Sequence, residues 1–179
     1  TDPSELFIRR DRDPASGVTI AATVDGVRPF MIETQSLVSS AVYGTPQRSS
    51  TGFDTRRLNM LLAVLEKRAG FRLGAKDVFL NIAGGLKVSD PAIDLAVVSA
   101  VLSSNLDAPV DHHTALAAEV GLSGEIRPVA RIEQRIMEAA RMGFTEMVIS
   151  GFHREIRDVP GLKISKVYKV EGLVRLLFS

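Results

Sequence analysis

The sequence predicts an α/β (α+β) domain in which a mixed β-sheet packs against helices. Short apolar runs typical of strands alternate along the 179 residues with longer runs of helical spacing, which is the pattern of a layered domain. An Asp25-Gly26 pair between two extended runs predicts an antiparallel hairpin, so the sheet is expected to be mixed rather than purely parallel. The chain is 45% hydrophobic and 24% charged, as expected of a globular domain.

The first half of the sequence predicts three strands and one helix. Residues 18–24 and 29–34 form the hairpin, and the polar stretch 44–52, rich in glycine and serine, is expected to be an exposed loop. Leucines at positions 58, 61, 62 and 65 recur at helical spacing, with Asp54 or Thr55 as the cap and Gly70 as the end. Residues 77–82 form a short apolar strand, and the glycines that follow it predict a tight turn.

The second half repeats the alternation of strands and helices. Asp90 followed by Pro91 predicts a capped helix beginning, and the helix body over 92–102 is apolar on nearly every face, so it is expected to be buried. A strand is predicted over 116–120, followed by a turn between Gly121 and Gly124 and by a helix that ends near Gly143. Strands over 145–149 and 162–167 and a helix over 170–178 complete the domain.

Composition excludes several classes of function. The chain has no cysteine, which removes disulfides, cysteine zinc sites and cysteine nucleophiles. No apolar run approaches the roughly 20 residues that a membrane-spanning helix needs, and the first residues do not resemble a signal peptide. The net charge is only +1, so any nucleic-acid site must come from local clustering of basic residues.

The common catalytic motifs are absent from the sequence. There is no phosphate loop of the GxxxxGK[ST] type and no GxSxG nucleophile motif, although counting residues alone does not exclude a Ser-His-Asp triad. His112 and His113 are adjacent and His153 is isolated, and two neighbouring histidines without a third ligand predict a solvated loop rather than a metal site. No cofactor is expected for this chain.

Residues 87–94 and 121–129 resemble the proteolytic domain of Lon proteases. In that family a serine at the beginning of a buried helix is the nucleophile and a lysine on a later helix is the base. The corresponding positions here are Ala92, which has no nucleophilic atom, and Arg135, whose guanidinium stays protonated. The resemblance therefore implies a Lon-protease-like (ribosomal S5 domain 2-like) fold without proteolysis. Lys87 and Ser89 are the alternative pair that could replace the lost dyad.

A closer resemblance covers essentially the whole chain. The runs DPSELF, GVRP, ETQSLV, RLNMLLAVLEKR, DVFLNIAGG and GLSGEIR are similar to the C-terminal, Lon-like part of the RadA/Sms family of bacterial RecA-like repair ATPases. The family's four-cysteine zinc motif, phosphate loop and Lys-Asn-Arg-Phe-Gly motif are absent, so ATP, Mg and Zn are implied only for missing N-terminal parts. Residues 1–16 are expected to be the lead-in from those parts and residues 17–179 the Lon-like domain.

The resemblance implies a partner, an assembly and a set of binding residues. It implies a cytoplasmic hexameric ring that drives branch migration on single-stranded or branched DNA, with this domain supporting ring assembly. The basic residues that match DNA-binding positions of the family are Arg28, Arg48, Arg57, Lys87 and Arg127, where the match of Arg48 rests on Pro46-Gln47-Arg48. Contacts of this kind would be to phosphates and independent of base sequence. The alternative is a serine-lysine peptidase or a peptide-binding domain that keeps a Lon-like groove, and Ala92 and Arg135 discriminate the two functions.

Overall fold

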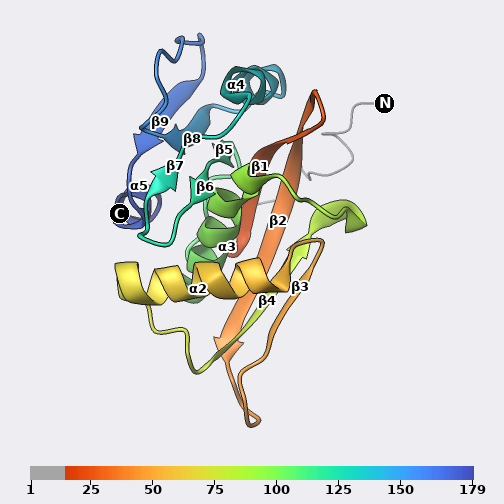
Figure 1. The fold of residues 1–179 in the computed structure, drawn as a ribbon, viewed down its shortest axis with the longest axis vertical. Helices are drawn as coiled ribbons and strands as arrows, with labels where there is room; N and C mark the ends of the chain where they lie inside the picture. The colour runs from red at the N-terminus through yellow and green to blue at the C-terminus, as the bar shows by residue number, and fades with distance from the viewer. Residues whose placement is uncertain (1–14) are drawn as a thin grey trace.

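The structure, a computed structural model, describes residues 15–179, so most of the predicted lead-in over 1–16 lies outside the described residues (Figure 1). Its strands are β1 (Val18–Asp25), β2 (Arg28–Ser40), β3 (Arg48–Thr51), β4 (Lys76–Ile82), β5 (Thr114–Ala117), β6 (Glu119–Val120), β7 (Ile126–Arg127), β8 (Glu146–Ser150) and β9 (Lys163–Val167). Seven of them form one sheet in the order β3-β4-β2-β1-β5-β8-β9, and β6 pairs with β7.

The sheet is mixed, as the sequence predicts. β2 is antiparallel to both β1 and β4, and the hairpin of β1 and β2 runs along most of the molecule (Figure 1). The pairs β3–β4, β1–β5, β5–β8 and β8–β9 are parallel. The prediction of an α/β fold is confirmed.

The helices begin and end close to the predicted residues. They are α2 (Thr55–Ala69), α3 (Asp94–Leu106), α4 (Ile132–Arg141) and α5 (Val170–Phe178), with 3-10 turns η1 (Ala83–Gly85) and η2 (Pro91–Ile93). The Asp54 side chain accepts a hydrogen bond from the Arg56 amide at the beginning of α2, and Gly70 ends this helix with φ 75°. A left-handed φ favours glycine, so the sequence at Gly70 determines where α2 stops.

Apolar side chains of the sheet alternate between two buried clusters. In β1, Ala21 belongs to one cluster, whereas Ile20 and Ala22 belong to the other, as expected from the period of two in a strand. Helices α2, α3 and α5 contribute to the first cluster, and α4 contributes to the second. Every residue of α3 from Asp94 to Ser103 is buried, which confirms the prediction from its apolar composition.

The prediction of a loop over 44–52 is wrong for part of that stretch. Residues 48–51 form β3, an edge strand whose burial alternates between half-buried and exposed. Its residues are polar because only one edge is paired, in parallel with β4. A short edge strand of this type has no apolar pattern, so composition alone indicated a loop.

The strand predicted over 116–120 is interrupted at Ala118. The Ala118 amide donates to the Ala92 carbonyl at 3.0 Å, and the Leu95 amide donates to the Ala118 carbonyl at 3.1 Å. These two bonds replace ladder bonds and divide the predicted strand into β5 and β6. They also fix the beginning of α3 against the sheet, next to Ala92, which is one of the two predicted dyad positions.

Candidate functional site

The beginning of α3 is built on the side chain of Asp90. Asp90 has extended backbone, and its Oδ1 accepts a hydrogen bond from the Ala92 amide at 3.1 Å. Pro91 occupies the first position of the turn, where no amide hydrogen is needed. Ala92 is fully buried. The cap is therefore as predicted, but the first turn is the 3-10 turn η2 rather than α-helix.

Arg135 of α4 extends to the same carboxylate from the other face of the sheet. Its Nη1 lies 2.5 Å from Oδ2 of Asp90 and its Nη2 lies 3.1 Å from Oδ1. Its Nε donates to the Ala130 carbonyl at 2.9 Å, and Nη1 also donates to the Ala22 carbonyl at 2.9 Å. The side chains of Arg135 and Asp90 are only 3% and 8% exposed. The backbone amide of Ala92 and the guanidinium of Arg135, the two predicted dyad positions, thus both bind the carboxylate of Asp90.

This ion pair determines the chemistry of the position. Burial alone would raise the pKa of Asp90, but the hydrogen bond and charge of Arg135, with the amides of Ala92 and Val24, lower it below its ordinary value. Asp90 is therefore ionised at neutral pH and holds Arg135 as a fixed cation. Ala92 offers no nucleophilic oxygen, and a guanidinium accepts no proton.

A groove of about 670 Å³ lies next to this ion pair. It is bordered by the beginning of α2, the loop between β4 and α3, and β6. Its charged lining consists of the cations Arg57 and Lys87 and the carboxylates Asp54, Asp90, Asp94 and Glu119. Positive charge in the groove is therefore balanced by acidic groups along its walls.

Arg57 is held by a buried carboxylate in the groove. Its Nη2 and Nε both bond to the Asp94 carboxylate, and Nη2 also donates to the Val120 carbonyl at 3.0 Å. The hydrogen bond to Asp94 raises the pKa of Arg57. Burial raises the pKa of Asp94, and the bonds from Arg57 and the Val120 amide offset only part of that effect. Arg57 therefore has a structural task that its sequence position did not indicate.

Lys87 and Arg127 are more accessible than Arg57. Lys87 is exposed in the loop that precedes α3, and it forms no ion pair with another described residue. The Arg127 side chain is 56% exposed, and its Nε lies 3.4 Å from Oε1 of Glu119, which lines the groove. The structure therefore brings Arg57 and Lys87 to one groove, and Arg127 lies next to it through its contact with Glu119.

Neither of the other two predicted binding residues lines the groove. Arg28 is exposed at the beginning of β2, and its backbone lies opposite Asp25 in the register of the hairpin. Asp25 and Lys87 line a smaller cavity of about 110 Å³ between the hairpin and the loop before α3. Because Lys87 also lines the groove, Arg28 lies near the side of the groove where Lys87 is found. Arg48 is on the edge strand β3, where its Nη2 donates to the Leu73 carbonyl at 2.7 Å. The Arg48 side chain is therefore partly used within the fold.

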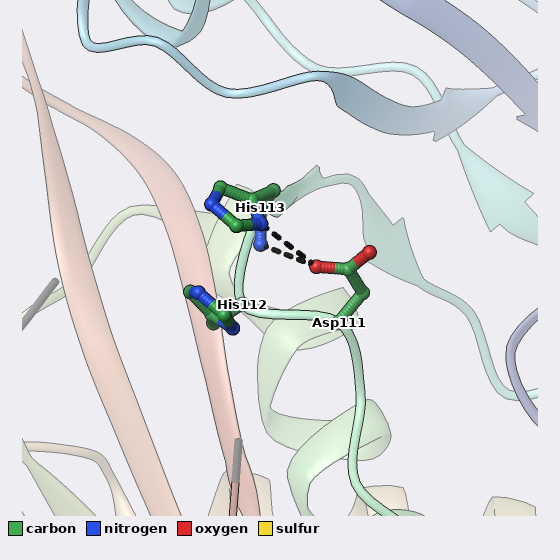
Figure 2. A group of neighbouring side chains, drawn as sticks. All are labelled: Asp111, His112 and His113. Atoms are coloured by element: carbon green, nitrogen blue, oxygen red, sulfur yellow. Dashed lines mark hydrogen bonds and ion pairs between the residues drawn. The ribbon is translucent and has the colours of Figure 1, made fainter. Parts of the chain in front are cut away.

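Asp111, His112 and His113 form a group of possible metal ligands before β5. Their ligand atoms all lie within 4.8 Å of one another, so Asp111 offers a possible third ligand atom that the sequence analysis did not identify. Oδ1 of Asp111 accepts a hydrogen bond from the His113 amide at 2.8 Å and lies 3.2 Å from Nδ1 of the same residue (Figure 2). The two imidazole rings are tilted by 41° with centroids 4.0 Å apart, so they lie against each other. The absence of a metal here stays a prediction.

The sequence did not reveal the Asp90–Arg135 ion pair, because the two residues are 45 positions apart. One feature could have indicated it. Arg135 lies on the apolar stripe of α4, next to Ile136 and one turn before Ala139, both buried. An arginine within a buried stripe predicts a buried partner of opposite charge.

The structure defines the chain as an α/β domain, and its similarity to known proteins shows its family. The chain belongs to the family described as subunit ChlI of Mg-chelatase, whose model matches residues 34–151. It is also similar over almost its whole length to proteins named DNA repair protein RadA, which confirms the resemblance to the RadA/Sms family.

Three of these relatives illustrate the similarity. The chain is 45% identical to RadA of Bacillus subtilis (strain 168) over 97% of its length, and 42% identical to RadA of Streptococcus pyogenes serotype M1 over 99%. It is 45% identical to RadA of Listeria monocytogenes serovar 1/2a (strain EGD-e) over 83% of its length. The matched region spans 38%, 40% and 32% of these three relatives, in their C-terminal part.

Proposed function

We propose that this chain is the non-proteolytic, Lon-protease-like domain of a RadA-type DNA repair ATPase acting in the bacterial cytoplasm. In this proposal residues 17–179 support a hexameric ring for branch migration and contact DNA phosphates without reading base sequence. Residues 1–16 are the lead-in from the ATPase part. The observation that supports the proposal is the buried Arg135–Asp90 ion pair beside Ala92. Ala92 and Arg135 are the two positions that the resemblance assigns to a serine-lysine dyad.

The ion pair argues against peptide hydrolysis on two grounds. A serine nucleophile would need to replace Ala92, and a neutral lysine would need to replace Arg135. Even a lysine at position 135 would lie beside the ionised Asp90, and a neighbouring negative charge keeps an ammonium protonated. We therefore expect that Ala92→Ser combined with Arg135→Lys creates no peptidase.

Peptidase activity can be measured directly on an unstructured protein substrate. We expect no turnover by the natural chain or by the variant that carries both Ala92→Ser and Arg135→Lys. Ser89 and Lys87 are the residues of the alternative pair, so Ser89→Ala and Lys87→Ala are the informative variants. Turnover that is lost in either of them would establish the peptidase alternative instead.

The proposed DNA contact rests on the exposed cations beside the groove. Lys87 has no ion-pair partner among residues 15–179, Arg28 is exposed near it, and Arg127 is held only by a partly exposed glutamate. Long flexible cations in such positions reach phosphates without reading bases. The guanidinium groups of Arg57 and Arg48 already donate hydrogen bonds within the fold. They would therefore bind DNA only through N–H groups that these bonds do not use.

The DNA test compares variants of two exposed cations with a control at an exposed lysine elsewhere. We expect Lys87→Ala and Arg127→Ala each to weaken binding of a mixed-sequence duplex, and to reduce the slope of log affinity against log salt by about 0.9 per lost contact. Lys67→Ala is the control, because this exposed lysine lies about 15 Å further along α2 than Arg57. Equal affinities and slopes in all three variants would contradict the proposed contact.

Ring assembly requires a separate measurement. We expect light scattering to give a mass several times 19.4 kDa at high protein concentration if this domain alone supports the ring. Several weak DNA contacts would then add through high effective concentration, so the affinity for DNA should rise with the measured mass. A monomer at all concentrations would assign ring assembly to the ATPase part.

A further inference from the structure

Two aromatic side chains are exposed together where β8 and β9 end. Phe152 follows β8 and is 55% exposed, and Tyr168 follows β9 and is 49% exposed. Their ring centroids are 5.1 Å apart and their planes are inclined by 86°, which is an edge-to-face pair. An aromatic pair that contacts itself and still leaves about half of each side chain in solvent offers free ring faces to a ligand.

Gly151 leaves open the space that the tyrosine ring occupies. A Cβ atom placed at residue 151 would lie 2.3 Å from Cζ, 2.4 Å from Cε1 and 2.7 Å from Cε2 of Tyr168. The ring therefore lies directly on the backbone of Gly151, in a space that no other residue type would leave open. The ring of Tyr168 thus lies between the space left by Gly151 and the ring of Phe152, with about half of its side chain exposed.

Cations surround this tyrosine. A hollow of about 470 Å³ beside it is lined by Lys166, Val167, Tyr168, Lys169, Gly172, Arg175 and Leu176. No carboxylate belongs to this lining, and none of the three cations forms an ion pair with another described residue. The groove next to Asp90 differs, because four carboxylates line it.

We propose that Phe152, Lys166, Tyr168, Lys169 and Arg175 form a binding site for single-stranded nucleic acid. A base stacks on the ring of Tyr168, and the neighbouring phosphates are bound by the three cations. We call these five residues the aromatic–basic site. The inference rests on the proposed function, because it specifies the DNA structure that such a domain would bind and the residues that bind it.

The geometry favours a single strand over a duplex. Proteins that bind single strands combine a positive track for phosphates with aromatic faces for bases, and every base has a face that can stack. The bases of an intact duplex are already stacked on each other, so the Tyr168 ring would contribute nothing to duplex binding.

The aromatic–basic site is distinct from the groove that contains Lys87. It lies on β9 and α5, whereas the groove lies between α2, β6 and the loop before α3 (Figure 1). Duplex binding that depends on Lys87 tests the proposed function. Single-strand binding that depends on Tyr168 tests this inference, so each can fail without the other.

The chain provides its own optical probe for stacking. It has two tyrosines and no tryptophan, and the second tyrosine, Tyr43, is 88% exposed in the loop between β2 and β3 at the far end of the molecule (Figure 1). In a Tyr43→Phe variant the tyrosine fluorescence comes from Tyr168 alone. We expect an oligothymidylate of about 12 nucleotides to quench this fluorescence on binding. In the Tyr168→Phe variant, where Tyr43 is the source, the same oligonucleotide should leave the fluorescence unchanged.

Affinity for the same oligonucleotide gives a second readout. We expect Tyr168→Ala to weaken binding by about five- to 150-fold, the loss that corresponds to one stacked base. Tyr168→Phe keeps the ring and should bind nearly as well as the natural chain, and Tyr43→Ala is the matched control with no effect. Gly151→Ala should displace the ring and weaken binding even though Tyr168 is present.

An abasic oligomer of the same length separates stacking from phosphate contact. It carries the same phosphates without bases, so we expect weaker binding and no quenching of Tyr168. Equal binding of the abasic and normal oligomers would overturn the inference and leave contact with phosphates alone. A fall in molecular mass caused by Tyr168→Ala, with unchanged affinity for the single strand, would also overturn it and assign this surface to contact between copies of the chain.

Discussion

At the scale of single residues, Asp90 has several tasks at once. Its two oxygens accept hydrogen bonds from the amides of Ala92 and Val24, the hydroxyl of Thr23 and the guanidinium of Arg135. An N-cap requires only the first of these bonds. Because the other donors come from β1 and α4, this carboxylate connects the beginning of α3 to the sheet and to the helix on the opposite face.

Removing this carboxylate should therefore cost more than removing a simple cap. We expect Asp90→Ala to reduce the free energy of unfolding by about 3–5 kcal/mol, because it leaves the guanidinium of Arg135 buried without a partner. Asp54→Ala is the matched control: Asp54 caps α2 from an exposed position and forms no ion pair within residues 15–179, so its loss should cost about 0.5–2 kcal/mol. Urea denaturation measures both values, and equal losses would show that Arg135 does not depend on Asp90.

The pKa of Asp90 predicts how stability depends on pH. A carboxyl group whose folded pKa is lowered stabilises the fold above its unfolded pKa, and this contribution is lost as pH falls through the folded pKa. For Asp90 the loss should begin at about pH 4 and continue below it, because its pKa lies below the ordinary value of 3.8. Denaturation from about pH 7 to about pH 2 should show a flatter decline in Asp90→Asn than in the natural chain.

Asp94 is a control, because its pKa is shifted in the opposite direction to that of Asp90. Its pKa is raised, mainly by burial, so its contribution to stability is fully present below its unfolded pKa and is lost as pH rises through the folded pKa. On acidification, protonation of Asp94 favours the folded state, whereas protonation of Asp90 disfavours it. Asp94→Asn removes the first of these two effects. Stability of this variant should therefore decline more steeply on acidification, and a flatter decline would contradict the assignment.

At the scale of elements, the Arg57–Asp94 ion pair joins α2 to the beginning of α3 and to β6. The side chain of Asp94 is 1% exposed and that of Arg57 is 27% exposed. Asp94 also accepts a hydrogen bond from the Val120 amide at 3.1 Å, while Arg57 donates to the carbonyl of the same residue. The pair thus fixes three elements around one wall of the groove.

We expect Arg57→Ala to reduce the free energy of unfolding by about 3–5 kcal/mol, since it leaves the buried Asp94 without its cation. Arg56→Ala is the neighbouring control, because Arg56 is exposed and its loss should change stability by no more than about 0.5 kcal/mol. The double variant Arg57→Ala with Asp94→Ala should lose less than the sum of the single changes. Additive losses in urea denaturation would contradict the coupling.

The elements differ in how far the sequence predicts them. The hairpin, α2 and α4 are predictable because their signals are local: Asp25-Gly26 at the turn, Asp54 and Gly70 around a helical repeat, and apolar spacing along α4. The strand β3 and the interruption at Ala118 are not, since each depends on hydrogen bonds to residues far away in the sequence. The same limit applies to the site. Ala92 and Arg135 could be selected from a family resemblance, whereas their connection through Asp90 needed the fold.

At the scale of the whole molecule, one sheet serves both buried clusters. Strands β1, β2, β5 and β8 each contribute side chains to the cluster under α2 and α3 and to the cluster under α4. Arg135 adds a direct connection, because it extends from α4 to Asp90 at the beginning of α3. Neither cluster can lose its strands without exposing the other.

This sharing predicts a single cooperative unfolding transition. Leu62→Ala in the first cluster and Ile136→Ala in the second should each cost about 2–5 kcal/mol, because both side chains are almost fully buried. Each variant should shift the urea midpoint of the whole chain and leave the slope m unchanged. Far-UV circular dichroism reports the helices, and the fluorescence of Tyr168 in a Tyr43→Phe background reports the end of β9, so the two probes should give coincident curves. Two separate transitions in the Ile136→Ala variant, with the cluster under α4 melting first, would show that the connection through Asp90 and Arg135 is too weak to join the two faces.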